Sequence, residues 1–282
     1  MPAPDAAAPP PPPTQLPPLP AVLPVFPLTG SLLLPGNWLP LNVFEPRYRN
    51  LVEDAMGERS AAATEGDRRE PAAPEKKRRG RARRGAGGDD RDQGDDRDQG
   101  ELGGRWIGMI QPRVPQQDNW PALELPPENP ELYAVGCAGS IERCEPQPDG
   151  RYLILLRGAS RFRVRRELPR RRGYRLVAAD YAEFVADRTE AEAAIDPAPL
   201  LHALRGFGES RGLAFDLDVL AALPGVALLN GLAAALPFPP AEKQALLEAS
   251  GPSERRQLLL DLMSMGIEPL DPEDYYAPPT VH

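Results

Sequence analysis

The chain contains few of the side chains that enzymes most often use to move protons, attack substrates or bind metals. Its 282 residues include only two histidines and two cysteines. His202 stands in a leucine-rich stretch, where we expect it to pack or to be partly exposed rather than to catalyse. A Ser–His–Asp triad needs a histidine that a second group orients, and nothing around His202 or His282 supplies that arrangement. The composition therefore predicts that the chain is not an enzyme, a hydrolase included.

Cysteine is equally scarce, and its spacing does not suit a metal. Cys137 and Cys144 are seven positions apart, unlike the CxxC spacing of metal and redox pairs. If both stand on one strand, an odd offset predicts that they point to opposite faces. We expect two reduced thiols, no metal site and no cofactor.

Lysine is the third scarce residue, and its positions exclude one kind of nucleotide site. The only lysines are Lys76, Lys77 and Lys243, and none of them follows a glycine. A phosphate-binding loop needs a GK[ST] sequence, because the lysine must reach the nucleotide phosphates. ATP hydrolysis at such a loop is therefore not expected.

Long hydrophobic runs are absent from the sequence. No apolar run approaches the roughly 18 residues of a membrane span, and the first 20 residues lack the basic and apolar regions of a secretory signal. The net charge of −8 favours solubility and argues against a protein that binds nucleic acid or membrane over its whole surface. We expect a cytoplasmic protein without a membrane partner.

Proline, by contrast, is abundant, with 37 residues gathered in tails and loops. We expect residues 1–20 to be a disordered, extended tail and residues 267–282 to be a second tail. Residues 57–104 contain a DDRDQG repeat and no aliphatic residue larger than alanine before Leu102. Such a segment buries too little apolar area to offset the entropy of ordering, so we expect a disordered insertion.

Two expected folding units remain between these segments, at 21–185 and 190–266. In the first unit, short apolar runs at 22–26, 31–34 and 38–44 predict strands, and Pro46 begins a helix. Further runs between 105 and 185, separated by turn signals, complete a small antiparallel barrel. In the second unit the apolar spacing becomes helical, with stops such as Gly251-Pro252.

Several of these stretches resemble one known family, the amino-terminal substrate-binding domain of the ATP-dependent protease Lon. The resemblance implies an α+β fold, a PUA-like pseudo-barrel of antiparallel strands followed by a carboxy-terminal helical bundle. The insertion at 57–104 departs from the family pattern, and we expect no ATPase or Ser–Lys protease domain in this chain. The stretches that carry the resemblance are FPL…LLPG, FEPRYR, the VGC-G-I strand and the GxxRFRV strand.

The resemblance implies a polypeptide-binding function without catalysis. Unfolded or flagged polypeptides are the expected ligands, and the module would act as an adaptor in protein quality control for a separate ATP-dependent protease or a chaperone. In FEPRYR, Glu45, Arg47 and Tyr48 combine charge with an aromatic anchor, which makes them the candidate binding residues. The alternative for these three residues is that they only cap and position the helix.

RNA binding is the alternative function. Nine arginines and a single acidic residue, Glu167, lie between Arg157 and Arg175. Alternation along a strand predicts that three of the arginines share an outer face, and three more follow at a turn, which suits contacts to phosphates. The six candidate RNA contacts are Arg161, Arg163, Arg165, Arg170, Arg171 and Arg172.

Overall fold

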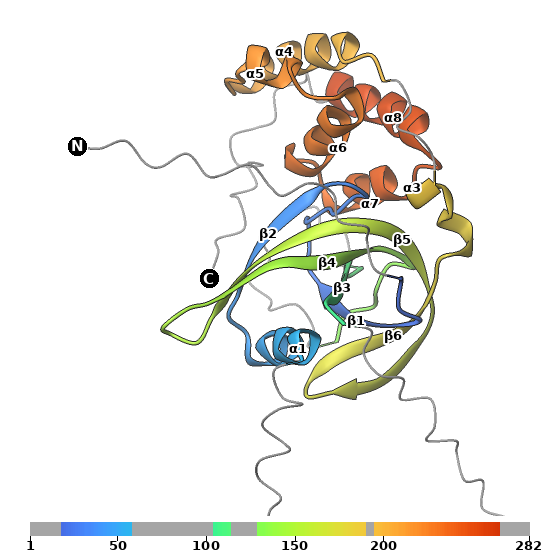
Figure 1. Ribbon diagram of the computed structural model, residues 1–282. Helices are drawn as coiled ribbons and strands as arrows, with labels where there is room; N and C mark the ends of the chain where they lie inside the picture. The colour runs from blue at the N-terminus through green and yellow to red at the C-terminus, as the bar shows by residue number, and fades with distance from the viewer. Residues whose placement is uncertain (1–17, 58–103, 114–128, 190–194, 266–282) are drawn as a thin grey trace, which may run out of the picture.

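A barrel of strands carries a group of helices on one side (Figure 1). The computed structural model describes residues 18–57, 104–113, 129–189 and 195–265. The expected insertion, the second tail and most of the first tail lie outside the described residues. The strands are β1 (Val22–Pro27), β2 (Trp38–Val43), β3 (Trp106–Ile110), β4 (Val135–Pro146), β5 (Tyr152–Arg171) and β6 (Tyr174–Asp180).

The strand order is β2-β5-β4-β3-β1-β6, and β5 also pairs with β6, so five strands close on themselves. Closure is possible because β5 is long: its first part pairs with β2, and its last part from Arg163 onward pairs with β6. The ladders are antiparallel except for β1 with β3, which are parallel. A parallel pair needs a crossover, and here β2 and α1 (Pro46–Met56) lie in it.

A small apolar cluster fills the inside of the closed barrel. It takes at least one side chain from each of the five strands that close on themselves. Two glycines leave room for Phe162, because a Cβ on Gly108 or Gly136 would meet the edge of its ring. The cluster includes Leu23, Trp106, Ala138, Phe162 and Val177.

The segment between β1 and β2 differs from the expectation. Ser31–Leu34 is not a strand, although Leu32, Leu33 and Leu34 are buried. The segment instead docks on β5 at Gly158, whose N–H donates to Asn37 O at 2.8 Å. A Cβ on Gly158 would lie 2.1 Å from Leu34 O, so the approach requires glycine. Alternation alone cannot distinguish such a docked coil from a paired strand.

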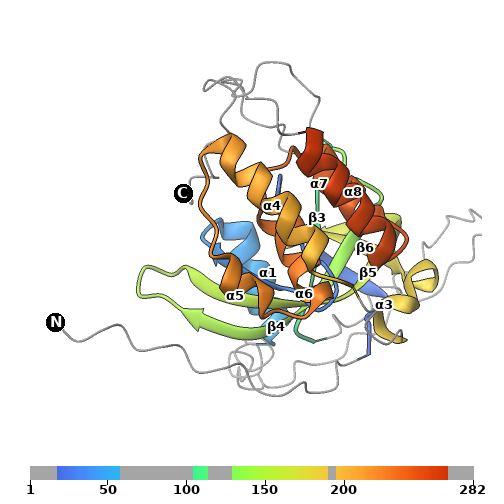
Figure 2. The same ribbon diagram turned by 90° about the horizontal axis from the view of Figure 1, so that it is seen from above.

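The helices lie over one end of the barrel, as the view from above shows (Figure 2). A linker of η2 (Ala182–Phe184) and α3 (Ala186–Thr189) leads from β6 to them. Their bounds are α4 (Ala198–Arg211), α5 (Leu217–Ala221), α6 (Gly225–Ala235), α7 (Pro240–Glu248) and α8 (Pro252–Met265). None of the helices that the structure describes is long and apolar enough to span a bilayer.

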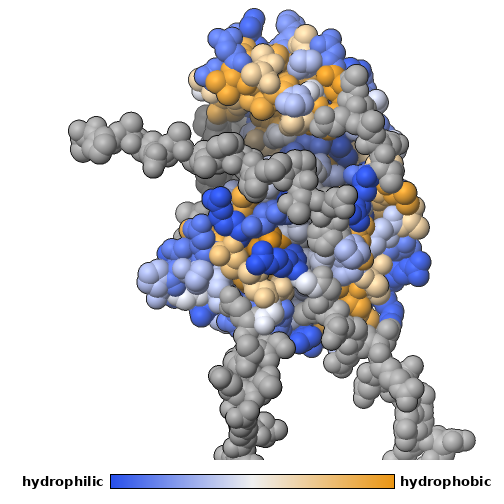
Figure 3. Space-filling model, in the orientation of Figure 1, coloured by the Kyte–Doolittle hydropathy of each residue, from blue (hydrophilic) through white to orange (hydrophobic). Residues whose placement is uncertain are grey.

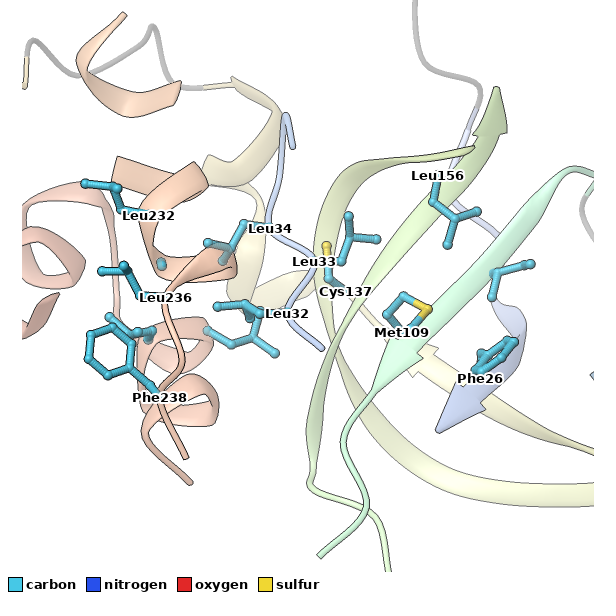
Figure 4. Close-up of a cluster of buried hydrophobic side chains, with 14 of the residues drawn as sticks. Phe26, Leu32, Leu33, Leu34, Met109, Cys137, Leu156, Leu232, Leu236 and Phe238 are labelled. Carbon is cyan, nitrogen blue, oxygen red and sulfur yellow. The ribbon is translucent and has the colours of Figure 1, made fainter. Parts of the chain in front are cut away.

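A second, larger core joins the barrel to the helices. Leu33 lies on the strand side with Met109 and Leu156, whereas Leu32 and Leu34 lie on the helix side (Figure 4). Because adjacent residues of one coil serve both sides, the docked segment connects the two halves. The helical side chains near it are Leu232, Leu236 and Phe238.

A buried arginine also joins the two halves, and it corrects one prediction. Arg161 is only 3% exposed, although it lies on the outer face of β5, opposite its neighbour Phe162, as alternation predicts. It is buried because the linker and the end of α7 cover this outer face. The guanidinium binds Asp187 at 2.7 Å and donates to Leu247 O and Ala249 O at the end of α7.

A similar bulge overturns the prediction for the two cysteines. Cys137 is fully buried in the larger core, and Cys144 packs against the same core. The register of β4 shifts between Ile141 and Arg143, so the odd offset no longer separates the faces. Burial raises the pKa of the Cys137 thiol well above its usual range, which keeps it protonated.

The α+β fold class is as the sequence predicts, a pseudo-barrel followed by a helical part. One parallel ladder is the difference from the expected all-antiparallel barrel. The described residues neither confirm nor contradict the domain limits at 21–185 and 190–266, which stay predictions.

Candidate functional site

The amino-terminal turn of α1 presents the three residues that the sequence singles out. Glu45 has extended backbone, and its carbonyl accepts from the N–H groups of Tyr48 and Arg49 in the first turn of the helix. Its carboxylate binds the Arg47 guanidinium at 2.7 Å, and both side chains are about two-fifths exposed. That guanidinium also lies 4.8 Å from the centroid of the Tyr48 ring.

Tyr48 has a different position from its two neighbours. It is 6% exposed, and its ring stacks on Phe26 of β1 with 4.0 Å between centroids. Burial raises the pKa of its phenol, although Arg47 beside it acts in the opposite direction. Tyr48 therefore holds α1 against the barrel, while Glu45 and Arg47 are the members of this set that solvent reaches. A role in ligand contact stays a prediction for all three.

The turn between β5 and β6 is fixed on α1 by a buried carboxylate. Arg172 adopts φ 48°, a left-handed conformation that is strained for a residue other than glycine. Asp54 accepts from Arg172 at 2.6 Å and from the Tyr174 hydroxyl at 2.7 Å. Glu53 binds the same guanidinium at 2.7 Å. These bonds to charged groups stabilise the turn in spite of its strain.

The structure brings two of the predicted sites together at this place. A Cβ added to Gly173 would lie 3.3 Å from Arg47 Cβ, so the turn and the start of α1 are in contact. Arg170 and Arg171 precede Arg172 in that turn and are exposed. The polypeptide prediction and part of the RNA prediction thus describe one surface, which a linear sequence does not reveal.

The other predicted RNA contacts do not form an open basic ribbon. Arg161 is buried, and Arg172 is bound to Glu53 and Asp54. Arg163 binds Glu183 at 2.7 Å and Arg165 binds Asp180 at 2.8 Å. These ion pairs cancel the positive charge that phosphate binding would use. The arrangement does not support the RNA alternative.

A second surface, missed by sequence reasoning, lies on the sheet formed by β2, the first part of β5 and the end of β4. Residues that face each other in an antiparallel ladder share a face, and Pro40 pairs with Leu155 while Asn42 pairs with Leu153. Trp38 is 39% exposed and Leu153 is 42% exposed. We call Trp38, Pro40, Leu153 and Leu155 the apolar arm face. The space-filling view shows apolar surface bordered by polar surface over these strands (Figure 3).

One sequence signal for this face was present. Leu153 and Leu155 alternate with Ile154 and Leu156 in RYLILLRG, so both faces of the strand are apolar. Ile154 and Leu156 belong to the larger core, which leaves the other pair facing outward. When a strand is apolar on both faces, other elements of the protein cover both faces, or the uncovered face binds a partner.

The edge of β2 is not suited to the addition of another strand. Among the strands that the structure describes, β2 pairs with β5 alone, at one end of the strand order. Pro40 stands in its middle and has no N–H, and prolines of edge strands keep that position on the solvent side. An added strand would lose a hydrogen bond there. Side chains of the arm face, not backbone groups of the edge, are the better means of contact.

A serine motif that the sequence prediction passed over also belongs here. Gly208–Gly212 reads GESRG, a match to G-x-S-x-G. Ser210 lies in the last turn of α4, and its hydroxyl donates to Phe207 O at 2.9 Å. The motif of hydrolases instead stands on a turn from strand to helix. The match therefore lacks the structural context of a nucleophile, and His202 lies exposed earlier on the same helix.

Metal and cofactor chemistry has no visible support in the part of the chain that the structure describes. There, no group of three or more histidine, cysteine, aspartate or glutamate side chains could hold a metal ion. Lys243, the one lysine among these residues, is buried and donates to Ala234 O at 2.9 Å. Burial lowers the pKa of its ammonium group.

The barrel and the helices beside it match a known family of domains. Residues 22–265 match the family described as the ATP-dependent protease La (LON) substrate-binding domain. The chain belongs to this family, and its described part is a substrate-recognition module.

Solved structures and curated proteins were compared as well. A Lon N-terminal domain protein from Xanthomonas campestris is 24% identical, with a TM-score of 0.45, over 85% of this chain and 97% of the other. The N-terminal domain of Lon protease from the Mycobacterium avium complex is 16% identical, with a TM-score of 0.47, over 86% and 98% of the two chains. A search of curated proteins found no match.

Proposed function

We propose that this chain is a non-catalytic module that binds unfolded or flagged polypeptides and delivers them, as an adaptor, to a separate ATP-dependent protease or a chaperone in the cytoplasm. Membership of the substrate-binding family supports the choice of polypeptide as ligand. The exposed apolar arm face is the observation that carries the proposal, since unfolded chains expose the apolar side chains that such a face would cover.

The proposed contact region runs from the arm face to the start of α1. Phe44 follows β2 directly and is 39% exposed. In the chain it stands between Trp38 of the arm face and the pair of Glu45 and Arg47. Tyr48 supports this region from beneath through its stack on Phe26. Apolar side chains would supply most of the affinity, and the Glu45–Arg47 pair would fix the direction of the bound segment.

The test is binding of the whole chain to a permanently unfolded, fluorescently labelled protein. We expect Trp38→Ser combined with Leu153→Ser to weaken binding at least tenfold, because both side chains are exposed and lose apolar contact area. Arg47→Ala should weaken binding by a smaller factor. Thermal unfolding of each variant checks that the fold persists.

The matched control is Val219→Ser combined with Leu223→Ser. These two side chains are also exposed and apolar, but they lie in or just after α5, on the helical part. Unchanged affinity in the control with loss in the arm variant supports the proposed region. Equal affinity of the arm variant and the unaltered chain would remove the arm face from the site.

A further inference from the structure

The three outward arginines beside the start of α1 form a small basic corner, consisting of Arg47, Arg170 and Arg171. Arg47 comes from the first turn of α1, and the other two are the last residues of β5, just before the turn that packs on α1. All three side chains reach solvent, and Arg171 is about half exposed. Phe44, whose side chain is 39% exposed, precedes Glu45 and so stands three positions before Arg47 in the chain.

The arginines of the corner differ in how fully their charge is balanced. Glu45 neutralises Arg47 at 2.7 Å. Arg170 instead donates to an uncharged amide, Asn129 Oδ1, at 2.5 Å. Arg171 lies 3.4 Å from Asp54, a carboxylate that already accepts from Arg172 and Tyr174. A guanidinium has five N–H donors, so Arg170 and Arg171 retain donors and positive charge for another acceptor.

The strained turn explains why the two arginines stand together. Arg172 takes its left-handed conformation and turns inward, where Asn50 binds it from both sides: Asn50 Nδ2 donates to Arg172 O at 2.9 Å, and Arg172 Nη2 donates to Asn50 Oδ1 at 2.6 Å. This clamp fixes the turn on α1 while its two preceding residues remain at the surface. A rigid turn loses less entropy when its side chains bind a ligand.

We infer that the basic corner recognises carboxylate groups, so that the clients of this chain are polypeptide segments in which apolar residues are followed by aspartate or glutamate. The inference rests on the proposed function and adds a chemical class of client to it. Guanidinium groups bind carboxylates through paired N–H donors, and Arg170 and Arg171 are the groups with that capacity. The apolar part of the segment would lie on the arm face and Phe44.

The experiment uses the whole chain and three labelled peptides of equal length. All three carry the same apolar half, and the other half is acidic, neutral or lysine-rich. We expect the acidic peptide to bind most tightly and to lose affinity as salt is raised, because exposed charges are screened. Arg170→Gln combined with Arg171→Gln should weaken the acidic peptide about three- to tenfold and leave the neutral peptide unchanged.

Arg163→Gln combined with Arg165→Gln is the control, because it removes the same charge from the same strand at the ion pairs with Glu183 and Asp180. If none of the peptides binds, the proposed function itself is wrong. If the three bind equally and the corner variant changes nothing, the function stands and the carboxylate inference fails. Tighter binding of an RNA oligomer of equal charge, lost in the corner variant, would also overturn the inference.

Discussion

Arg161 and Arg172 come from the same arginine-rich stretch, and both bind carboxylates inside the protein rather than ligands outside it. Arg161 connects β5 to the linker through Asp187 and to the last carbonyls of α7. The end of a helix leaves carbonyl groups without intrahelical donors, and a guanidinium can satisfy several at once. At the scale of the residue, the linker and the end of α7 decide this role, because they cover the outer face of β5 at Arg161.

Replacing Arg161 with methionine should strongly destabilise the protein. The substitution removes the guanidinium from Asp187, which keeps the backbone N–H of residue 161, and from the buried carbonyls at the end of α7. The charged side chains of Arg161 and Asp187 are only 3% and 7% exposed. Breaking a buried ion pair by removing one partner costs about 3–5 kcal/mol. Urea unfolding followed by circular dichroism measures the free energy of unfolding.

The control is Arg163→Met. Because the ion pair of Arg163 with Glu183 is exposed, its loss should change the free energy of unfolding by less than about 1 kcal/mol. Equal effects would show that burial does not govern the contribution of Arg161.

At the scale of the element, the coil between β1 and β2 is held by backbone contact rather than by strand pairing. Gly36 N–H donates to Gly158 O at 2.9 Å, and Gly158 N–H returns the bond to Asn37. These two bonds hold the coil so that Leu33 and Leu34 enter opposite sides of the larger core. The coil is therefore the element through which the barrel and the helices share a core.

Gly158→Ala should separate the coil from β5. Its Cβ would lie 2.1 Å from Leu34 O, and backbone on both sides leaves little freedom to move. Crowding of this kind costs about 1–3 kcal/mol, and we expect the loss in thermal stability to be accompanied by faster hydrogen exchange at Gly36, whose N–H donates to Gly158 O.

Gly206→Ala is the matched control for this glycine. Gly206 lies inside α4, and a Cβ there would meet nothing within 4 Å. Alanine in a helix interior is more favourable than glycine by roughly 0.5–1 kcal/mol, so this variant should be slightly more stable. If the Gly158→Ala protein is as stable as the unaltered chain and its hydrogen exchange is unchanged, the close contact between Gly158 and Leu34 O does not hold the coil.

At the scale of the whole molecule, three buried tyrosines connect separate parts of the fold, and each makes its contacts with a neutral phenol. Tyr48 stacks on β1, Tyr174 donates to Asp54 of α1, and Tyr181 donates to Pro20 O at 2.9 Å. Burial raises the pKa of all three phenols, and the hydrogen bond to Asp54 raises that of Tyr174 further. An ionised phenol is therefore disfavoured at three places around the barrel.

These raised values predict loss of stability in alkaline solution. A phenol whose pKa is higher in the folded than in the unfolded chain contributes stability below about pH 10, its unfolded value, and loses it as pH rises further. We expect the free energy of unfolding to fall above about pH 10. Burial of the Cys137 thiol adds a further loss of stability in the same pH range.

Urea unfolding at several pH values measures this loss of stability. The absorbance of tyrosinate should show that some of the seven tyrosines ionise only when the protein unfolds. Tyr174→Phe should make the decline shallower; an unchanged decline would show that Tyr174 does not contribute.

Part of the candidate site could be predicted from the sequence. Glu45, Arg47 and Tyr48 were expected at the start of a helix, and α1 does begin at Pro46. The sequence did not indicate that the Arg170–Arg171 turn would lie against that helix, because 123 positions separate Arg47 from Arg170. The apolar arm face was missed as well, since an apolar run does not say which of its faces the core covers.

Composition and local pattern by themselves determined the fold class, the scarcity of catalytic side chains and the family resemblance. Each of these depends on residue types and on spacing within a few turns or strands. Only the tertiary structure decided which arginines are ion-paired inside, which are exposed, and that Cys137 and Cys144 share a core. For the cysteines, the physical reason is that one extra residue in β4 reverses the facing of the residues beyond it. For Arg161, the reason is that the linker and the end of α7, both distant in sequence, cover a face that alternation leaves outward.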